Sequence, residues 1–152
     1  MTAFELPVSE LVPHDGPMCL LDAVVAVAPD TLTAQVVPRG DGLFDEDGTV
    51  GAWVGLEYMA QTMAALAGWE RRKTGQPPRV GLMLGTRRYQ CHVPHFVVGQ
   101  PLLVTATREF EADNGIGVMQ CRIETPDHQL LAEALLSAYQ PDDLQDFLKE
   151  HA

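Results

Sequence analysis

Hydrophobic and polar positions change their spacing along the chain, and the first third of the pattern predicts strands. Residues 18–28 (MCLLDAVVAVA) and 31–37 (TLTAQVV) are apolar stretches separated by Pro29-Asp30 and closed by Pro38 and Gly40. Apolar runs between turn residues are typical of β-strands. Residues 39–50 (RGDGLFDEDGTV) carry four acids and several glycines, so they are expected to form a polar loop without regular structure.

The pattern then shifts to the period of a helix. Between Ala52 and about Arg72 there is no proline, and apolar residues recur every three or four positions. These apolar residues are Trp53, Leu56, Met59, Ala60, Met63, Ala64 and Ala67. Few polar residues interrupt them before Glu70, so the helix should be enclosed by the rest of the fold. Gly75, Pro77 and Pro78 are expected to end it.

Strand patterns fill most of the remaining chain. Four stretches, 80–91, 101–111, 116–124 and 130–139, are separated by turn residues, while residues 5–12 and the acidic tail after Pro141 suggest at most short helices. Two strands, one buried helix and four meandering antiparallel strands predict an α+β architecture in which the sheet wraps around the helix. That order is typical of a single hot-dog domain over residues 1–152. Its exposed edge strands make a homodimer the expected state.

Composition narrows the class of protein. The net charge of −11 argues against nucleic-acid binding, which needs a dense basic face. No apolar stretch is long enough for a membrane span, and the N-terminus lacks the pattern of a signal peptide. The three cysteines (Cys19, Cys91, Cys121) are too scattered for a disulfide framework or a zinc site, so reduced thiols in the cytoplasm are expected.

Six of the ten cations lie within eighteen residues: Arg71, Arg72, Lys73, Arg79, Arg87 and Arg88. One interpretation is a solvated helix end, since cations suit helix C-termini. The other is a docking patch for an anionic acyl carrier, such as coenzyme A or an acyl carrier protein.

Glu57 is the first candidate for chemistry. Its neighbours one helical turn away are mostly apolar, and a carboxylate that loses hydration is suited to act as a general acid or base. The alternative is a structural carboxylate that reaches solvent or caps a loop. Gly51 and Ala52, at the expected helix start, supply small residues and backbone N–H groups that could hold a thioester carbonyl. Gln61, one turn beyond Glu57, is a further candidate for substrate binding.

The histidines offer a possible base but no metal site. His14 lies in a tight Pro-rich turn before the first strand, and His92 and His95 flank Pro94. Each is either a hydrogen-bonded loop residue or a functional group. We expect His14 to be the catalytic histidine and His95 to contact substrate. The three histidines lack a metal-ligand spacing, and no nucleotide-binding pattern occurs, so neither a metal nor a cofactor is expected.

Several motifs together resemble a known family. Leu11-Val12-Pro13-His14 through Leu20-Leu21-Asp22, the stretch LEYMAQ (56–61) and Val98-Gly99-Gln100-Pro101-Leu102 resemble, in order, three motifs of bacterial 3-hydroxyacyl-acyl-carrier-protein dehydratases of the FabA/FabZ type. The variants HDGPM (14–18) and MLGTRRY (83–89) resemble most the ApeP-like branch, which is associated with aryl-polyene lipid synthesis. The resemblance implies that Glu57 is the catalytic acid and works with a histidine of the neighbouring subunit.

The chain departs from the family at that histidine, whose position is occupied by Leu43, and at the helix start, where Gly51-Ala52 replaces Pro-Gly. Three functions remain open. A dehydratase of fatty-acid or aryl-polyene-type synthesis would pair Glu57 with His14 or His95. A hot-dog thioesterase would use Glu57 alone to hydrolyse the thioester. A non-catalytic subunit would bind acyl chains or form a heterodimer with a competent dehydratase.

Overall fold

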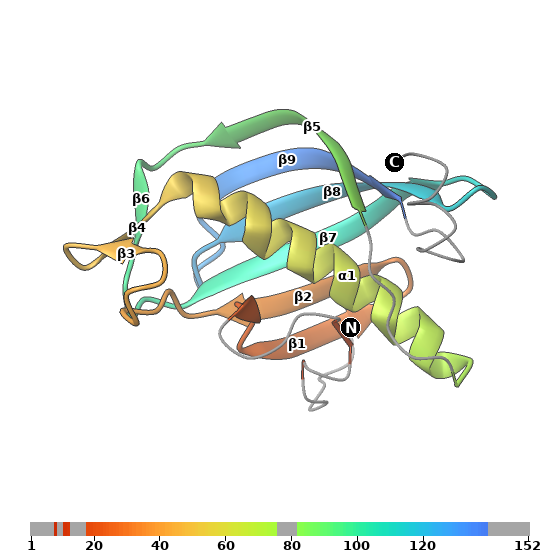
Figure 1. The fold of residues 1–152 in the computed structure, drawn as a ribbon, viewed down its shortest axis with the longest axis horizontal. Coiled ribbons are helices and arrows are strands. Elements are labelled where there is room, and N and C mark those ends of the chain that lie inside the picture. Colours follow the sequence, from red (N-terminus) through yellow and green to blue (C-terminus); the bar gives the residue numbers. More distant parts are fainter. Residues whose placement is uncertain (1–7, 9–10, 13–17, 76–81, 140–152) are drawn as a thin grey trace.

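One antiparallel sheet of six strands forms most of the molecule. The computed structural model describes residues 8, 11–12, 18–75 and 82–139 (Figure 1). The strands follow the spatial order β1-β2-β7-β8-β9-β5. Their bounds are β1 (Ala23–Ala28), β2 (Thr31–Val36), β5 (Leu82–Cys91), β7 (Leu102–Glu111), β8 (Ile116–Glu124) and β9 (Leu130–Tyr139). The long helix α1 (Gly55–Lys73) crosses one face of the sheet, which curves around it. This confirms the predicted hot-dog fold.

Alternation along the strands creates the core between sheet and helix. In β2, Leu32, Ala34 and Val36 are at most 1% exposed. On the other face of the strand Thr31 and Gln35 are half-buried, and Thr33 is 9% exposed. Since side chains alternate between the two faces of a strand, the same pattern in β7 and β8 buries Val104, Ala106, Cys121 and Ile123. Met59 and Leu66 of α1 are fully buried as well.

The region expected to be an irregular loop contains a short hairpin. β3 (Asp45–Glu46) pairs with β4 (Thr49–Gly51), and β4 pairs with β6 (His95–Val97) to form a second, three-stranded sheet. Gly48, between β3 and β4, has a φ of 77°, a conformation that glycine adopts without strain. The prediction was therefore wrong for residues 45–50, because a two-residue turn between short strands leaves almost no sequence signal, whereas residues 39–44 are irregular as expected.

Two other predictions needed correction. The first strand begins at Ala23, not Met18, because the backbone at Met18 and Leu20 bonds to the side chain of Gln61. The four later strands do not form one meander. β7, β8 and β9 do, but β5 lies at the far edge beside β9, which makes it one of the two edge strands of the large sheet.

The helix is covered on one side more than on the other. Its sheet-facing residues are buried, but Leu56, Ala60, Ala64 and Ala67 are only half-buried in the single chain. The expected full enclosure is thus incomplete in one protomer.

In the described part of the chain, Leu11 and Val12 donate backbone hydrogen bonds to the carbonyl of Val8, in agreement with the short turn predicted for residues 5–12. The acidic tail after Pro141 lies outside the described residues.

No helix among the described residues has the length and apolar character needed to cross a membrane. All three cysteines are free thiols, with Cys121 buried and Cys19 and Cys91 partly buried.

Candidate functional site

Glu57 lies in the first turn of α1 and is half-buried. A carboxylate in the first turn of a helix is stabilised by the partial positive charge of the helix N-terminus. Its Oε1 accepts a hydrogen bond of 3.0 Å from Nε2 of Gln61, one turn later on the same face. Helical spacing therefore brings together two of the residues selected from the sequence.

Gln61 is fully buried, and its side chain bonds both to α1 and to the segment before β1. Besides Glu57, its Nε2 donates to the carbonyl of Met18 at 2.7 Å, and its Oε1 accepts the N–H of Leu20 at 2.8 Å. The side chain thus attaches residues 18–20 to the helix and orients the carboxylate of Glu57. The substrate-binding role expected of Gln61 stays a prediction; its described hydrogen bonds are to the protein itself.

The sequence predicted free backbone N–H groups at the start of the helix, and the N–H of Ala52 is not free. A 3-10 turn over Ala52–Val54 leads into α1, and the N–H of Ala52 donates to the carbonyl of Pro94 at 3.3 Å. That N–H is therefore not free to hold a substrate carbonyl. Gly51 lies against the indole of Trp53, since a Cβ added at Gly51 would come within 2.5 Å of the indole Nε1.

The structure describes two of the three candidate histidines, His92 and His95. His14 lies outside the described residues, although Met18, four positions later, is anchored beside Glu57 through Gln61. His95 is exposed in β6, where it pairs across the ladder with Gly51. His92 is exposed in the preceding turn, and its backbone N–H donates to the carbonyl of Leu131.

A pocket that the sequence did not predict opens beside this site. It is a small hollow, partly open to solvent, between the loop after β2 and α1. Its lining residues are Leu20, Val36, Val37, Arg39, Asp41, Leu43, Phe44, Val50 and Tyr58. Leu43, at the position of the family's histidine, is therefore a wall of this pocket. Glu57 is not among the lining residues, so the pocket and the carboxylate are neighbouring features.

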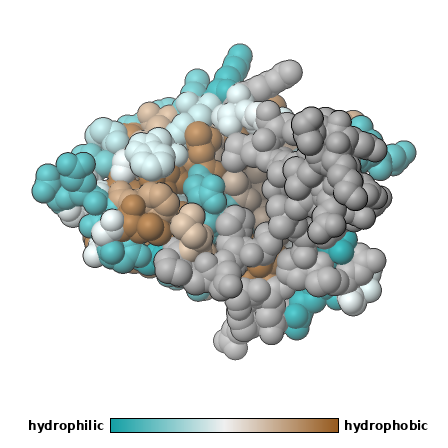
Figure 2. All heavy atoms as spheres, in the orientation of Figure 1, coloured by the Kyte–Doolittle hydropathy of each residue, from teal (hydrophilic) through white to brown (hydrophobic). Residues whose placement is uncertain are grey.

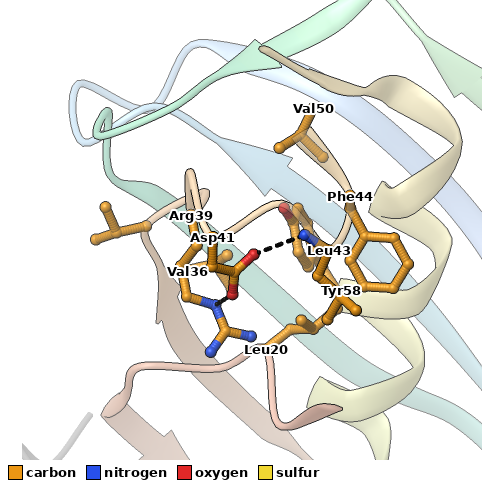
Figure 3. Close-up of a pocket in the computed structure, with 9 residues that line it drawn as sticks. Leu20, Val36, Arg39, Asp41, Leu43, Phe44, Val50 and Tyr58 are labelled. Atoms are coloured by element: carbon orange, nitrogen blue, oxygen red, sulfur yellow. Dashed lines mark hydrogen bonds and ion pairs between the residues drawn. The ribbon is translucent and has the colours of Figure 1, made fainter. Parts of the chain in front are cut away.

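The loop that carries Leu43 is held by its own polar residues. Asp41 accepts the N–H of Leu43 at 3.0 Å and lies 3.7 Å from Nε of Arg39 (Figure 3). Arg39 in turn donates to the carbonyl of Cys19 at 3.1 Å. These contacts link the loop to the segment that Gln61 also binds.

Tyr58 contributes the buried aromatic wall of the pocket. Its ring centroid lies 5.9 Å from that of Phe96, and the side chain is 3% exposed. Burial raises the pKa of the Tyr58 hydroxyl to about 12, so the group is a neutral phenol at physiological pH. The sequence analysis did not select Tyr58 as a pocket residue. Its position next to Glu57 in the LEYMAQ motif could have indicated it.

Large apolar side chains are exposed around the start of α1. Trp53 is 65% exposed and packs edge-to-face on Phe44, with 5.9 Å between ring centroids. Leu43 and Met18 are exposed nearby, at 42% and 47%. The space-filling view shows hydrophobic atoms gathered on this part of the molecule (Figure 2). We call Met18, Leu43, Phe44 and Trp53 the apolar rim.

Among the described residues, no cluster of His, Cys, Asp or Glu side chains has the arrangement of a metal site.

Comparison with solved structures supports the fold and relates it to dehydratases. The chain is similar to a chain of the dehydratase heterocomplex ApeI:P from Xenorhabdus doucetiae, with 28% identity, a TM-score of 0.87, and coverage of 96% of this chain and 97% of that one. Zebra fish thioesterase superfamily member 2 shares the fold at 11% identity, a TM-score of 0.60 and coverage of 78% and 80%.

AziG of S. sahachiroi also shares the fold, at 16% identity and a TM-score of 0.58, with coverage of 76% of this chain and 87% of that one. No curated protein matches the chain in sequence. The ApeP-like family model, described as ApeP dehydratase, matches residues 6–149, which is almost the whole length. The chain therefore belongs to the ApeP-like dehydratase family.

Proposed function

We propose that this protein removes water from a 3-hydroxyacyl thioester, with Glu57 as the catalytic acid or base. The observation that carries the proposal is the hydrogen bond from buried Gln61 to Glu57, which orients a half-buried carboxylate at the start of the helix. In the reaction, a base takes a proton from C2 and the C3 hydroxyl leaves with a proton from an acid. The products are a 2,3-enoyl thioester and water.

The second proton-transfer group in this proposal is His14. His14 lies four positions before Met18, and an extended chain spans at most about 3.6 Å per residue, or roughly 14 Å in all. Since Met18 is hydrogen-bonded to the same amide as Glu57, this length of chain allows His14 to reach the site. The alternative histidine, His95, lies on β6 beside Gly51, where it would contact substrate instead.

A second hot-dog subunit is part of the proposal. A similar chain is found in a structure described as a dehydratase heterocomplex, and Leu43 occupies the place of the family's histidine. Trp53 of the apolar rim is exposed, and tryptophan often anchors protein interfaces. About half of the residues of α1 are also only partly buried. We favour a heterodimer with a second dehydratase-like chain over a homodimer on these grounds.

The acyl group is proposed to arrive on an acyl carrier protein or on coenzyme A, both of which are anionic. Arg72 and Lys73 are exposed in the last turns of α1, where they can meet a negative partner. The thioesterase alternative gains only the shared fold, since the neighbours described as thioesterases are 8–15% identical.

The test is an assay of the purified protein with 3-hydroxyacyl thioesters on coenzyme A and on acyl carrier protein, read by mass spectrometry for loss of water. It is run alone and with a dehydratase-like hot-dog chain from the same source. Glu57→Gln keeps the size and hydrogen-bonding capacity of the side chain but removes its acid–base function, so it should lower the rate about 10²–10⁴-fold. Thermal unfolding should show an intact fold.

Three outcomes distinguish the alternatives. Enoyl product from the isolated protein supports a self-sufficient dehydratase. Product only in the mixture, with loss on Glu57→Gln, supports the heterodimer. Free thiol without enoyl product would establish a thioesterase instead, and an unchanged rate in Glu57→Gln would exclude the proposed role of Glu57.

A further inference from the structure

Tyr89 connects the edge of the large sheet to the start of the helix. It lies in β5, and its hydroxyl donates a hydrogen bond to the carbonyl of Ala52, the first residue of the 3-10 turn. Figure 1 shows β5 ending, and β6 following it, beside the N-terminal end of α1. A residue far along the chain from the helix is thus bonded to the peptide group five residues before Glu57.

Ala52 is held on its other side by the same region of the chain. Its N–H donates to the carbonyl of Pro94, in the turn that joins β5 to β6. Both polar backbone groups of Ala52 are therefore fixed by residues 89–94. The 3-10 turn cannot rotate unless at least one of these two hydrogen bonds breaks.

Gly55 provides the space that Tyr89 needs. A Cβ added at Gly55 would overlap the Tyr89 hydroxyl, and it would also lie 3.0 Å from Cδ1 of Ile123 and 3.2 Å from Cε2 of Phe96. Gly55 begins α1 and precedes Glu57 by two residues. The absence of a side chain there lets the tyrosine approach the helix axis at the turn that carries the carboxylate.

We infer that Tyr89 is a positioning residue for the dehydration, because it fixes the 3-10 turn and with it the first helical turn that carries Glu57. This inference rests on the proposed function. Tyr89 has no contact with the carboxylate among its described hydrogen bonds, so it acts through the backbone of Ala52. A shift of even about 1 Å in a catalytic group can lower a rate by on the order of 100-fold.

The hydroxyl stays a hydrogen-bond donor across the working pH range. Burial raises the pKa of Tyr89 well above its ordinary value, so the phenol remains protonated at neutral and mildly alkaline pH. The link between β5 and the helix start is therefore not a pH switch. It is a fixed contact whose removal needs a change of residue.

Tyr89→Phe tests the inference, since it removes one oxygen and keeps the ring. We expect kcat to fall about tenfold or more with KM changed less than about twofold, because the catalytic turn is displaced and the distant parts of the substrate site are not. The matched control is Tyr139→Phe, at the end of β9, which should leave both constants unchanged. Equal kcat in Tyr89→Phe and wild type would overturn the inference.

A readout independent of activity separates this inference from the proposed function. Trp53 is the middle residue of the 3-10 turn, and the other tryptophan is Trp69, so Trp69→Phe leaves Trp53 as the single fluorophore. In that background, Tyr89→Phe should change the emission of Trp53, while Tyr139→Phe should not. If Tyr89→Phe shifts the emission of Trp53 but Glu57→Gln keeps full activity, the proposed function is refuted and the contact between Tyr89 and the turn stands. If Tyr89→Phe leaves the emission unchanged, the contact itself is refuted.

A second variant covers the case in which Tyr89→Phe fails to fold. Gly55→Ala should displace the Tyr89 hydroxyl by direct overlap and reproduce the loss in kcat. Since the clash is with the hydroxyl, removing the hydroxyl should relieve part of the effect of Gly55→Ala. The double variant Gly55→Ala/Tyr89→Phe should therefore lose less kcat than the product of the two single losses. Strict multiplication of the two effects would show that Gly55 and Tyr89 act separately.

Discussion

Nε2 of Gln61 lies 3.0 Å from Oε1 of Glu57, one helical turn apart on α1. The same nitrogen donates to Met18, and the amide oxygen accepts the N–H of Leu20. A single buried side chain therefore connects the candidate catalytic carboxylate to the segment that follows His14. Because the amide satisfies both groups of the incoming segment, the geometry of the site and the anchoring of that segment depend on the same residue.

Replacing Gln61 with methionine should destabilise the protein and reduce its activity together. Methionine has a similar volume but cannot bond to Met18, Leu20 or Glu57, so buried backbone groups lose their partners at about 1–3 kcal/mol each. We expect the free energy of unfolding to fall by about 2–4 kcal/mol in urea denaturation. The dehydration rate should fall as well, since Glu57 loses the donor that orients it.

Leu66→Met is the control for this variant. Leu66 is fully buried in the same helix, and the change conserves volume without removing a hydrogen bond, so it should cost less than about 1.5 kcal/mol. If the two variants have equal stability, the amide of Gln61 contributes nothing beyond its volume.

The sequence predicted the elements that have strong periodic patterns. β8 and β9 match the predicted ranges 116–124 and 130–139, and the helix differs by only a few residues at its ends. The LEYMAQ motif also led to Glu57 and Gln61, because residues at a spacing of four lie on one face of a helix. The family and the fold followed from these features, and the match over residues 6–149 confirms them.

The remaining features depend on contacts between distant residues, which leave no local signal. Nothing near Tyr89 in the sequence indicates a bond to Ala52, and the carbonyl of Pro94 that occupies the N–H of Ala52 is equally distant along the chain. The place of β5 beside β9 is a matter of topology, since an antiparallel strand pattern does not specify its neighbour. The role predicted for His14 remains a prediction.

Arg108 should be a larger contributor to stability than other cations on the sheet. Its side chain is 11% exposed and pairs with Glu70 of α1 and with Asp30 in the β1–β2 turn, 3.1 Å away. Arg108→Met leaves Glu70 without this partner. Removing one member of a fully buried ion pair costs about 3–5 kcal/mol. Because Glu70 and Asp30 are 37% and 65% exposed, we expect a smaller loss of about 1–3 kcal/mol.

Arg122→Met is the matched change at an exposed pair. The Arg122 side chain is 48% exposed and lies 3.9 Å from Glu124, so its loss should cost less than about 1 kcal/mol. Thermal unfolding of both variants checks the difference. An equal decrease in the two would contradict the role assigned to the Arg108 network.

The buried thiol of Cys121 predicts a loss of stability in alkali. Burial raises its pKa from an ordinary 9.0 to about 12. The folded state therefore holds a proton that the unfolded state loses first, so stability is complete below pH 9 and decreases as the pH rises toward 12. The slope is at most about 1.4 kcal/mol per pH unit.

Urea denaturation between pH 9 and pH 11 measures this effect. Cys121→Ala, which has no titrating group, should be less stable than wild type at neutral pH because of the smaller side chain. Its stability should nevertheless decrease less steeply with pH. Parallel curves for the two proteins would show that the thiol is not held protonated by the fold.

Gly68 allows the N-terminal segment to lie against the helix. A Cβ at this position would overlap the carbonyl oxygen of Leu11 and lie 2.7 Å from its carbonyl carbon, and both atoms are backbone. Alanine in a helix interior is ordinarily favoured over glycine by about 1 kcal/mol. We expect Gly68→Ala to destabilise the protein instead, because the segment with buried Leu11 and Val12 must move away from the helix.

Gly85→Ala is the comparison, since no atom lies within 4 Å of a Cβ added there and the residue is exposed in β5. It should change the unfolding temperature little, whereas Gly68→Ala should lower it by several degrees. Because residues 11–12 lead directly into His14, Gly68→Ala should also lower the dehydration rate if His14 is the partner of Glu57. A stabilised Gly68→Ala protein would show that the close approach of Leu11 to the helix does not exist in solution.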